Sequence, residues 1–217
     1  MDVVTFTRPA LPAATLAFLL FAMVLPSVRL RRRTGRPALV LHRSGPPLQR
    51  VIGVGMALFM GAIVLWSAAH LAFGEQALGV WRVPDALRWS GWALVAVGFA
   101  FTVRAQVEMG ASWRIGIDSE RTELVTRGLF GVVRNPIFSG MLVVVTGMAL
   151  AAPSAWTVMG WLDYVLLVSL QVRLEEDHLL GLHGAAYQRY AARVGRFLPG
   201  VGRLEAPGLD AAPRITV

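Results

Sequence analysis

The 217-residue sequence contains no cysteine, which excludes disulfides, thiolate zinc sites, iron–sulfur clusters and thiol nucleophiles. It also contains no lysine, and its basic side chains are arginines and four scattered histidines. Without lysine, neither a Schiff base to a carbonyl cofactor nor a complete Walker A loop can form. The Gly-x-Ser-x-Gly and HExxH motifs are absent as well. Much of the chemistry of soluble enzymes is therefore excluded, and we expect no metal site.

Apolar residues are abundant instead. They make up 55% of the chain, against 16% for charged residues. Five apolar stretches reach or approach the ~20 residues that a membrane-spanning helix needs. They cover residues 11–28, 51–73, 89–103, 137–152 and 155–172. We predict an all-α polytopic membrane protein with about five transmembrane helices.

The arginines lie beside these stretches, so the net charge of +8 indicates membrane topology rather than nucleic-acid binding. A cluster from Arg29 to Arg36 follows the first stretch, as in a stop-transfer sequence and unlike a cleaved signal peptide. The loop at 74–88 is charge-balanced, and the turn at Pro153-Ser154 is uncharged. This pattern predicts an outside N-terminus and a cytoplasmic C-terminus.

Three regions follow from this order. Residues 1–110 hold the first three spans and a basic cytoplasmic loop. Residues 111–200 hold the last two spans as a hairpin, together with a C-terminal cytoplasmic helix, and form the predicted catalytic region. Residues 201–217 form a Pro/Gly-rich tail that we expect to be flexible.

Polar and charged residues with motif-like spacing are most concentrated on either side of the last hairpin. Arg134 and Glu176 lie about equally far from the Pro153-Ser154 turn, so a helical hairpin returns both to the same membrane depth. We therefore expect them to meet at the cytoplasmic boundary. Pro136 fits the first turn of a helix and biases Asn135 away from helical geometry.

The helical spacing continues beyond this point. Glu176, His183, Tyr187 and Tyr190 share one face at steps of three or four. They line either a pocket or the buried face of an amphipathic helix under the bundle.

Asp163 and its neighbour Tyr164 also allow two interpretations. They lie in the middle of the last span, where ionisable groups are costly. They either bond a neighbouring helix or line a substrate cavity.

These residues resemble motifs of the isoprenylcysteine carboxyl methyltransferase and phospholipid methyltransferase group of membrane enzymes. Three motifs occur in order between residues 112 and 199. They are an Arg-His-Pro-x-Tyr-like box, a Glu-Glu pair after a hairpin, and a Phe-Gly-x-x-Tyr-x-x-Tyr-like box before Arg-Phe-x-Pro. The matching residues are Arg134, Pro136, Gly140, Glu175, Glu176, Gly184, Tyr187, Tyr190, Arg196 and Pro199. Asn135 replaces the usual histidine, Phe138 the usual tyrosine and His183 a common phenylalanine.

The resemblance implies a membrane methyltransferase that binds S-adenosylmethionine at the cytoplasmic face. Its acceptor would be lipophilic: a carboxylate, an isoprenoid or a lipid headgroup. The implied catalytic residues are Arg134, Glu176 and Arg196. The implied cofactor-binding residues are Gly128, Leu129, Arg134, Asn135, Pro136, Phe138, Glu175, Glu176, His183, Tyr187 and Tyr190.

Individual roles follow from the charges of the cofactor. We expect Arg134 to bind its carboxylate and Glu176 its ribose or amino group, with Tyr187 and Tyr190 beside the adenosine. Arg196 would pair with a carboxylate acceptor. Because the methyl group leaves a sulfonium by direct displacement, the protein mainly aligns donor and acceptor and excludes water.

Two alternatives belong to other classes: an NADPH-dependent membrane reductase of the sterol-reductase type, and a non-catalytic membrane scaffold. The absence of lysine beside abundant Arg, Ala, Gly and Val is typical of a GC-rich bacterial genome. We therefore expect the bacterial inner membrane, with the active site facing the cytoplasm and no nucleic-acid partner. The identity of the acceptor and the oligomeric state are left open.

Overall fold

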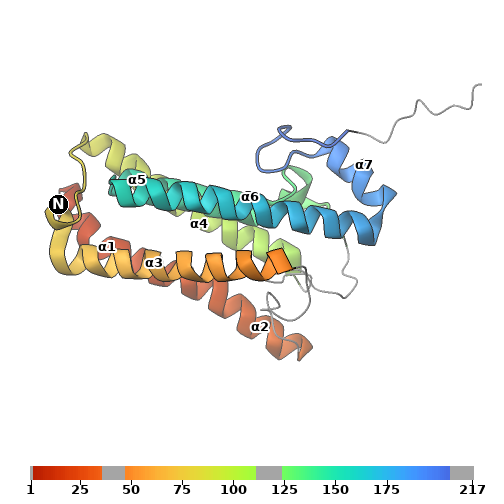
Figure 1. The fold of residues 1–217 in the computed structure, drawn as a ribbon, viewed down its shortest axis with the longest axis horizontal. Coiled ribbons are helices and arrows are strands. Elements are labelled where there is room, and N and C mark those ends of the chain that lie inside the picture. The colour runs from red at the N-terminus through yellow and green to blue at the C-terminus, as the bar shows by residue number, and fades with distance from the viewer. Residues whose placement is uncertain (1, 36–46, 111–123, 206–217) are drawn as a thin grey trace, which may run out of the picture.

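The computed structural model describes residues 2–35, 47–110 and 124–205, which form an elongated bundle of helices (Figure 1). The helices are α1 (Val3–Phe18), the π-helical η1 (Leu19–Val24), α2 (Leu25–Thr34), α3 (Pro47–Ala77), α4 (Asp85–Met109), the 3₁₀ turn η3 (Gly128–Gly131), α5 (Pro136–Ala151), α6 (Ala155–His183) and α7 (Ala185–Arg193). Predictions for residues 36–46, 111–123 and 206–217, including the second half of the basic loop and most of the tail, lie outside the described residues.

The prediction of an all-α polytopic membrane protein is confirmed. Within the described residues, four helices are long and apolar enough to cross a membrane: Val3–Arg33, Pro47–Ala77, Asp85–Met109 and Ala155–His183. The fourth of the five predicted spans corresponds to α5, a shorter apolar helix of 16 residues. The number of spans and the placement of the termini stay predictions.

The first span runs through a π-helical turn, and its sequence explains why. Pro26 has no backbone N–H, so the carbonyl of Ala22, four residues earlier, lacks its usual helical donor. The Nε2 group of Gln106 on α4 donates to that carbonyl instead, at 2.6 Å. An irregular backbone at membrane depth is thus satisfied by a neighbouring helix.

Helices α4 and α5 pack at very short range because each presents glycines seven residues apart. A Cβ atom added to Gly98 would lie 2.7 Å from the carbonyl oxygen of Gly140, and one added to Gly91 would lie 2.6 Å from that of Gly147. Small residues at such spacing let helix backbones approach closely in a membrane. This packing fixes the position of the N-terminal end of α5.

The hairpin of α5 and α6 forms as predicted, with Ala152, Pro153 and Ser154 between the helices. A capping box between Ser154 and Thr157 begins α6. The Tyr164 hydroxyl donates to the Phe138 carbonyl at 3.1 Å, so this residue has the structural bond to a neighbouring helix.

The prediction of one continuous helix from Glu176 to Tyr190 is wrong. Gly184 has a φ of 50°, a left-handed conformation that glycine adopts readily and that ends the helix. Helix α6 therefore stops at His183 and α7 begins at Ala185. The break turns α7 across the end of the bundle (Figure 1).

Candidate active site

The site is built where the chain after α7 returns to the segment before α5. The backbone N–H of Arg134 donates to the Gly195 carbonyl at 2.8 Å, and that of Asn135 to the Arg196 carbonyl at 3.1 Å. Gly195 has no room for a side chain, because an added Cβ would lie 2.7 Å from the backbone nitrogen of Gly200. Two segments about sixty residues apart are thereby held side by side.

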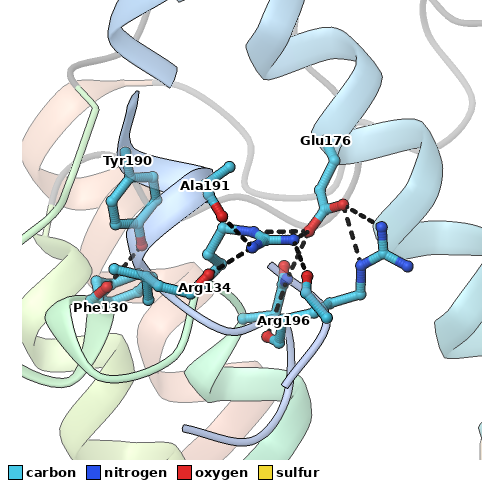
Figure 2. Close-up of polar contacts among 9 residues, drawn as sticks. Phe130, Arg134, Glu176, Tyr190, Ala191 and Arg196 are labelled. Atoms are coloured by element: carbon cyan, nitrogen blue, oxygen red, sulfur yellow. Dashed lines mark hydrogen bonds and ion pairs between the residues drawn. The ribbon is translucent and has the colours of Figure 1, made fainter. Parts of the chain in front are cut away.

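Arg134 uses all five of its guanidinium N–H donors. Its Nε and one Nη donate to Oε1 of Glu176 at 3.0 and 2.9 Å. The remaining donors go to the backbone carbonyls of Ala191, Val194 and Gly202. The side chain is 1% exposed. Arg134 therefore ties α5, α6, α7 and the C-terminal segment together (Figure 2).

Glu176 is saturated as well. Its Oε2 accepts from Nε and one Nη of Arg196 at 3.1 and 2.7 Å, while Oε1 holds Arg134 and, at 3.4 Å, Nδ2 of Asn135. Figure 2 shows the carboxylate between the two guanidinium groups. Two arginines face one carboxylate, so this cluster carries an excess positive charge, and its exposed member is Arg196, at 28% exposure.

A hollow of about 90 Å³ adjoins this cluster. Its walls come from the end of α4, the segment before η3, the start of α5, the end of α6 and α7. The lining residues are Met109, Leu124, Val125, Phe130, Arg134, Asn135, Pro136, Ile137, Phe138, Glu175, Leu179, Tyr187 and Tyr190. The hollow is apolar on most sides, with the guanidinium, amide and carboxyl groups on one.

Two phenols on α7 close one wall. The rings of Tyr187 and Tyr190 meet edge to face with centroids 6.0 Å apart, and the Tyr190 hydroxyl donates to the Phe130 carbonyl at 2.6 Å. Burial raises the pKa of Tyr190 to about 12. Burial, and secondarily the charge of Glu176, raises the pKa of Tyr187. Both phenols stay neutral near physiological pH, so they are walls and hydrogen-bonding groups rather than bases.

The η3 turn is held by a residue that the sequence did not single out. Oε2 of Glu108 on α4 accepts the backbone N–H of Leu129 at 2.7 Å. Gly128 has a φ of 61°, which favours glycine, and a Cβ there would run into the Glu108 carboxylate. Gly128 and Leu129 therefore pack against Glu108 and do not line the hollow.

The prediction that Arg134 and Glu176 meet is confirmed by their hydrogen bonds. Of the eleven predicted cofactor-binding residues, seven line the hollow: Arg134, Asn135, Pro136, Phe138, Glu175, Tyr187 and Tyr190. Gly128, Leu129, Glu176 and His183 do not, and the buried Nε2 of His183 has no hydrogen-bond partner among the described residues. The six lining residues that were not predicted share only apolar character, which does not distinguish them from other apolar residues of the bundle: Met109, Leu124, Val125, Phe130, Ile137 and Leu179.

The segment that contains most of the site resembles known proteins. The family model described as phospholipid methyltransferase matches residues 86–186, from the start of α4 to the start of α7. Among curated proteins, none matches the sequence. A solved structure of the eukaryotic intramembrane Ras methyltransferase, isoprenylcysteine carboxyl methyltransferase, is similar with a TM-score of 0.51 and 19% sequence identity.

The similarity covers 76% of this chain and 56% of that one, so this chain spans little more than half the length of its structural relative. At this level of identity the match concerns the fold. The family match, in contrast, comes from the sequence and includes Arg134, Glu175 and Glu176. The resemblance to the phospholipid methyltransferase and isoprenylcysteine carboxyl methyltransferase group, which the sequence predicted, is confirmed.

Proposed function

We propose that this protein is an S-adenosylmethionine-dependent methyltransferase that acts on a lipophilic acceptor at the membrane. One observation carries the proposal. A hollow with aromatic walls lies beside an Arg134–Glu176–Arg196 cluster that has excess positive charge, within the residues that resemble membrane methyltransferases. S-adenosylmethionine combines an aromatic base, a carboxylate and two positive centres, and supplies a methyl group on a sulfonium.

The lining chemistry fits this cofactor. Phe130, Phe138 and the two phenols offer apolar surface for the base. Glu175 offers a carboxyl group to a positive centre; its one hydrogen bond is from Nε2 of Gln171 on its own helix, at 2.8 Å. The volume of about 90 Å³ is below the range of about 300–1,000 Å³ of ligand pockets. Cofactor binding therefore requires one wall of the hollow to move. We expect Leu124 and Val125 to move, because they lie outside any helix.

The roles of the two arginines differ from those first expected. Arg134 has no donor left for a ligand, so it acts as a positioning residue that holds α6 and α7 against α5. One Nη group of Arg196 has no partner among the described residues, and the side chain is partly exposed, so it is the arginine available to an anionic group. We propose that Arg196 binds the cofactor carboxylate while Glu176 fixes the Arg196 side chain in place.

The orientation follows from the arginines that end α2. Leu30 packs against Met109 and Ile137, both of which line the hollow. Arg31, Arg32 and Arg33 in the last turn of α2 therefore lie at the same end of the bundle as the site. Because basic residues favour the cytoplasmic side, we propose that the site faces the cytoplasm of a bacterial inner membrane.

Titration calorimetry with S-adenosylmethionine tests the proposal in purified full-length protein. Arg196→Ala should weaken binding at least tenfold, because a charge-assisted hydrogen bond is lost. Arg193→Ala is the matched control. This exposed arginine ends α7, and its Nε donates only to the carbonyl of Arg189. Equal affinities of both variants and the wild type would remove Arg196 from the site.

A parallel arm separates the reductase alternative. S-adenosylmethionine, its demethylated product and NADPH are compared for their effect on the thermal unfolding of the wild type. The proposal predicts that the first two raise the melting temperature and that NADPH does not. Stabilisation by NADPH alone would overturn it.

A further inference from the structure

A second hollow lies on the surface of the bundle, between α3, α5 and α6. It is an apolar cleft of about 420 Å³, larger than the hollow beside Arg134, and its lining includes Phe59, Trp66, Met148, Trp156 and Asp163. Asp163 lies thirteen residues before Glu176 on α6, which corresponds to about 20 Å along the helix. The cleft is therefore separate from the proposed site of methyl transfer.

Asp163 is conspicuous because its carboxyl group has no partner among the described residues. It is exposed on the surface of α6 and makes no hydrogen bond and no ion pair there, whereas Glu75 is paired with Arg88 and Glu176 with Arg134. Asp163 is the ninth of the 29 residues of α6, an apolar helix long enough to cross a membrane. An ionisable group at such depth is costly and marks a functional site by default.

Trp66 provides a second unsatisfied group in the same cleft. Its indole Nε1 is buried and has no hydrogen-bond partner in the part of the chain that the structure describes, and the side chain lines the cleft together with Asp163. A buried N–H without an acceptor costs free energy. The cleft thus presents one carboxyl group and one N–H donor, surrounded by apolar side chains.

These two groups select the chemistry of an occupant. An ammonium group would serve Asp163 but has no lone pair for the Trp66 N–H, and it would carry a charge into the hydrocarbon. A carboxylate would accept from Trp66 but has no proton to donate to an ionised Asp163. A hydroxyl group donates and accepts. We propose that this cleft binds a lipophilic alcohol from the membrane, with its hydroxyl group between Asp163 and Trp66.

The volume sets the size of the alcohol. At about 30 Å³ per non-hydrogen atom, the share of one water molecule, the cleft holds about fourteen such atoms. Dodecan-1-ol is therefore a suitable probe. Binding of the radiolabelled alcohol to full-length protein in nanodiscs is measured against empty nanodiscs, with its methyl ether, which accepts but cannot donate, as the competing ligand.

The variants separate the two polar groups from the apolar walls. Asp163→Leu and Trp66→Phe should each weaken dodecan-1-ol binding about fivefold to tenfold. Trp89→Phe is the matched control, since Trp89 lies on α4 outside the cleft, is 40% exposed and should stay within twofold of the wild type. The methyl ether should bind the wild type more weakly than the alcohol does. It should bind Asp163→Leu as tightly as the alcohol does.

Asp163→Leu removes an unpaired carboxyl group from an apolar surface, so the variant should fold and melt at a higher temperature than the wild type. Two results would overturn the proposal: no saturable binding of dodecan-1-ol to the wild type, or unchanged binding by both polar variants. Dimerisation of the wild type in nanodiscs that Asp163→Leu abolishes would also overturn it, because a second copy would then cover the cleft. These readouts need no methyl transfer, so they stand apart from the proposed function.

Discussion

The two ends of α5 carry two buried arginine–glutamate pairs that look alike and differ in what they leave free. At one end, Arg134 binds Glu176 and three backbone carbonyls. At the other end, Arg88 of α4 binds Glu75, and its Nε donates to the carbonyl of Ala151, the last residue of α5, at 2.8 Å. Arg88 thus ties three segments of chain together at one end of the bundle, and Arg134 ties four together at the other.

The difference lies in charge balance and access. Around Ala151 one arginine meets one carboxylate, with the buried His70 3.7 Å from Glu75. Around Arg134, which lines a hollow, a second arginine joins. The cluster therefore has an excess positive charge, and the guanidinium group of Arg196 is partly exposed. A balanced buried pair closes an end of the bundle, whereas an unbalanced one retains the capacity to bind an anion.

The largest contrast is expected on removing the two central arginines. Arg134→Ala deprives three carbonyls and half of Glu176 of their donors, so we expect a loss of about 3–5 kcal/mol and no detectable cofactor binding. Arg88→Ala should cost about 1–3 kcal/mol, since Glu75 is 18% exposed, and should leave cofactor affinity unchanged. Denaturant unfolding and calorimetry of the folded protein measure both. Equal cofactor affinities of the two variants would contradict the assignment of the cofactor site to the Arg134 end.

Neutralising the two glutamates should have a smaller effect. Glu176→Gln leaves Arg134 and Arg196 facing each other without a carboxylate, so we expect about 2–3 kcal/mol less stability and cofactor binding at least tenfold weaker. Glu75→Gln should destabilise the protein while cofactor affinity stays within twofold of the wild type. The same two measurements apply, and cofactor affinity that falls equally in both variants would argue for a general loosening of the bundle.

Exchanging arginine for lysine should separate the two arginines that share Glu176. Lysine offers a point charge in place of a planar fork, so Arg196→Lys, at a partly exposed position, should cost about 1 kcal/mol and reduce cofactor affinity about fivefold. Arg134→Lys loses most of five hydrogen bonds and should behave like Arg134→Ala. Identical melting curves for the two lysine variants would contradict the assignment of different roles.

The sequence predicted one end of the bundle better than the other, for a physical reason. The pairing of Arg134 with Glu176 followed from helix length and a turn at Pro153, which are local quantities. Glu75 and Arg88 flank a loop whose charges balance, so no sequence pattern indicated a site there. The structure pairs them directly and also bonds Arg88 to the carbonyl of Ala151, about sixty residues away. The involvement of Glu108 and of the Gly202 carbonyl likewise depends on packing between distant segments, which no local pattern encodes.

The break at Gly184 was missed because the spacing of Glu176, Tyr187 and Tyr190 satisfies a continuous helix equally well. Periodicity reports which residues are buried, and all three are buried. It does not report the backbone angle of one glycine between them. The predicted set of cofactor-binding residues reached the right elements while including His183, the last residue of α6, which does not line the hollow.

The smallest expected effect concerns Tyr190, at the Arg134 end. Its pKa of about 12 in the folded protein exceeds the ordinary value of 10.0, so the folded chain keeps the phenol proton that the unfolded chain loses. The resulting stabilisation is complete below pH 10 and is lost as the pH rises towards 12. At pH 10.5 the loss should be about 0.8 kcal/mol, and Tyr190→Phe should lack it. The chain has no lysine and three tyrosines, so thermal unfolding between pH 9 and 11 reports the phenols with little interference. If the melting temperatures of wild type and variant fell equally with pH over this range, burial would not raise the pKa of Tyr190.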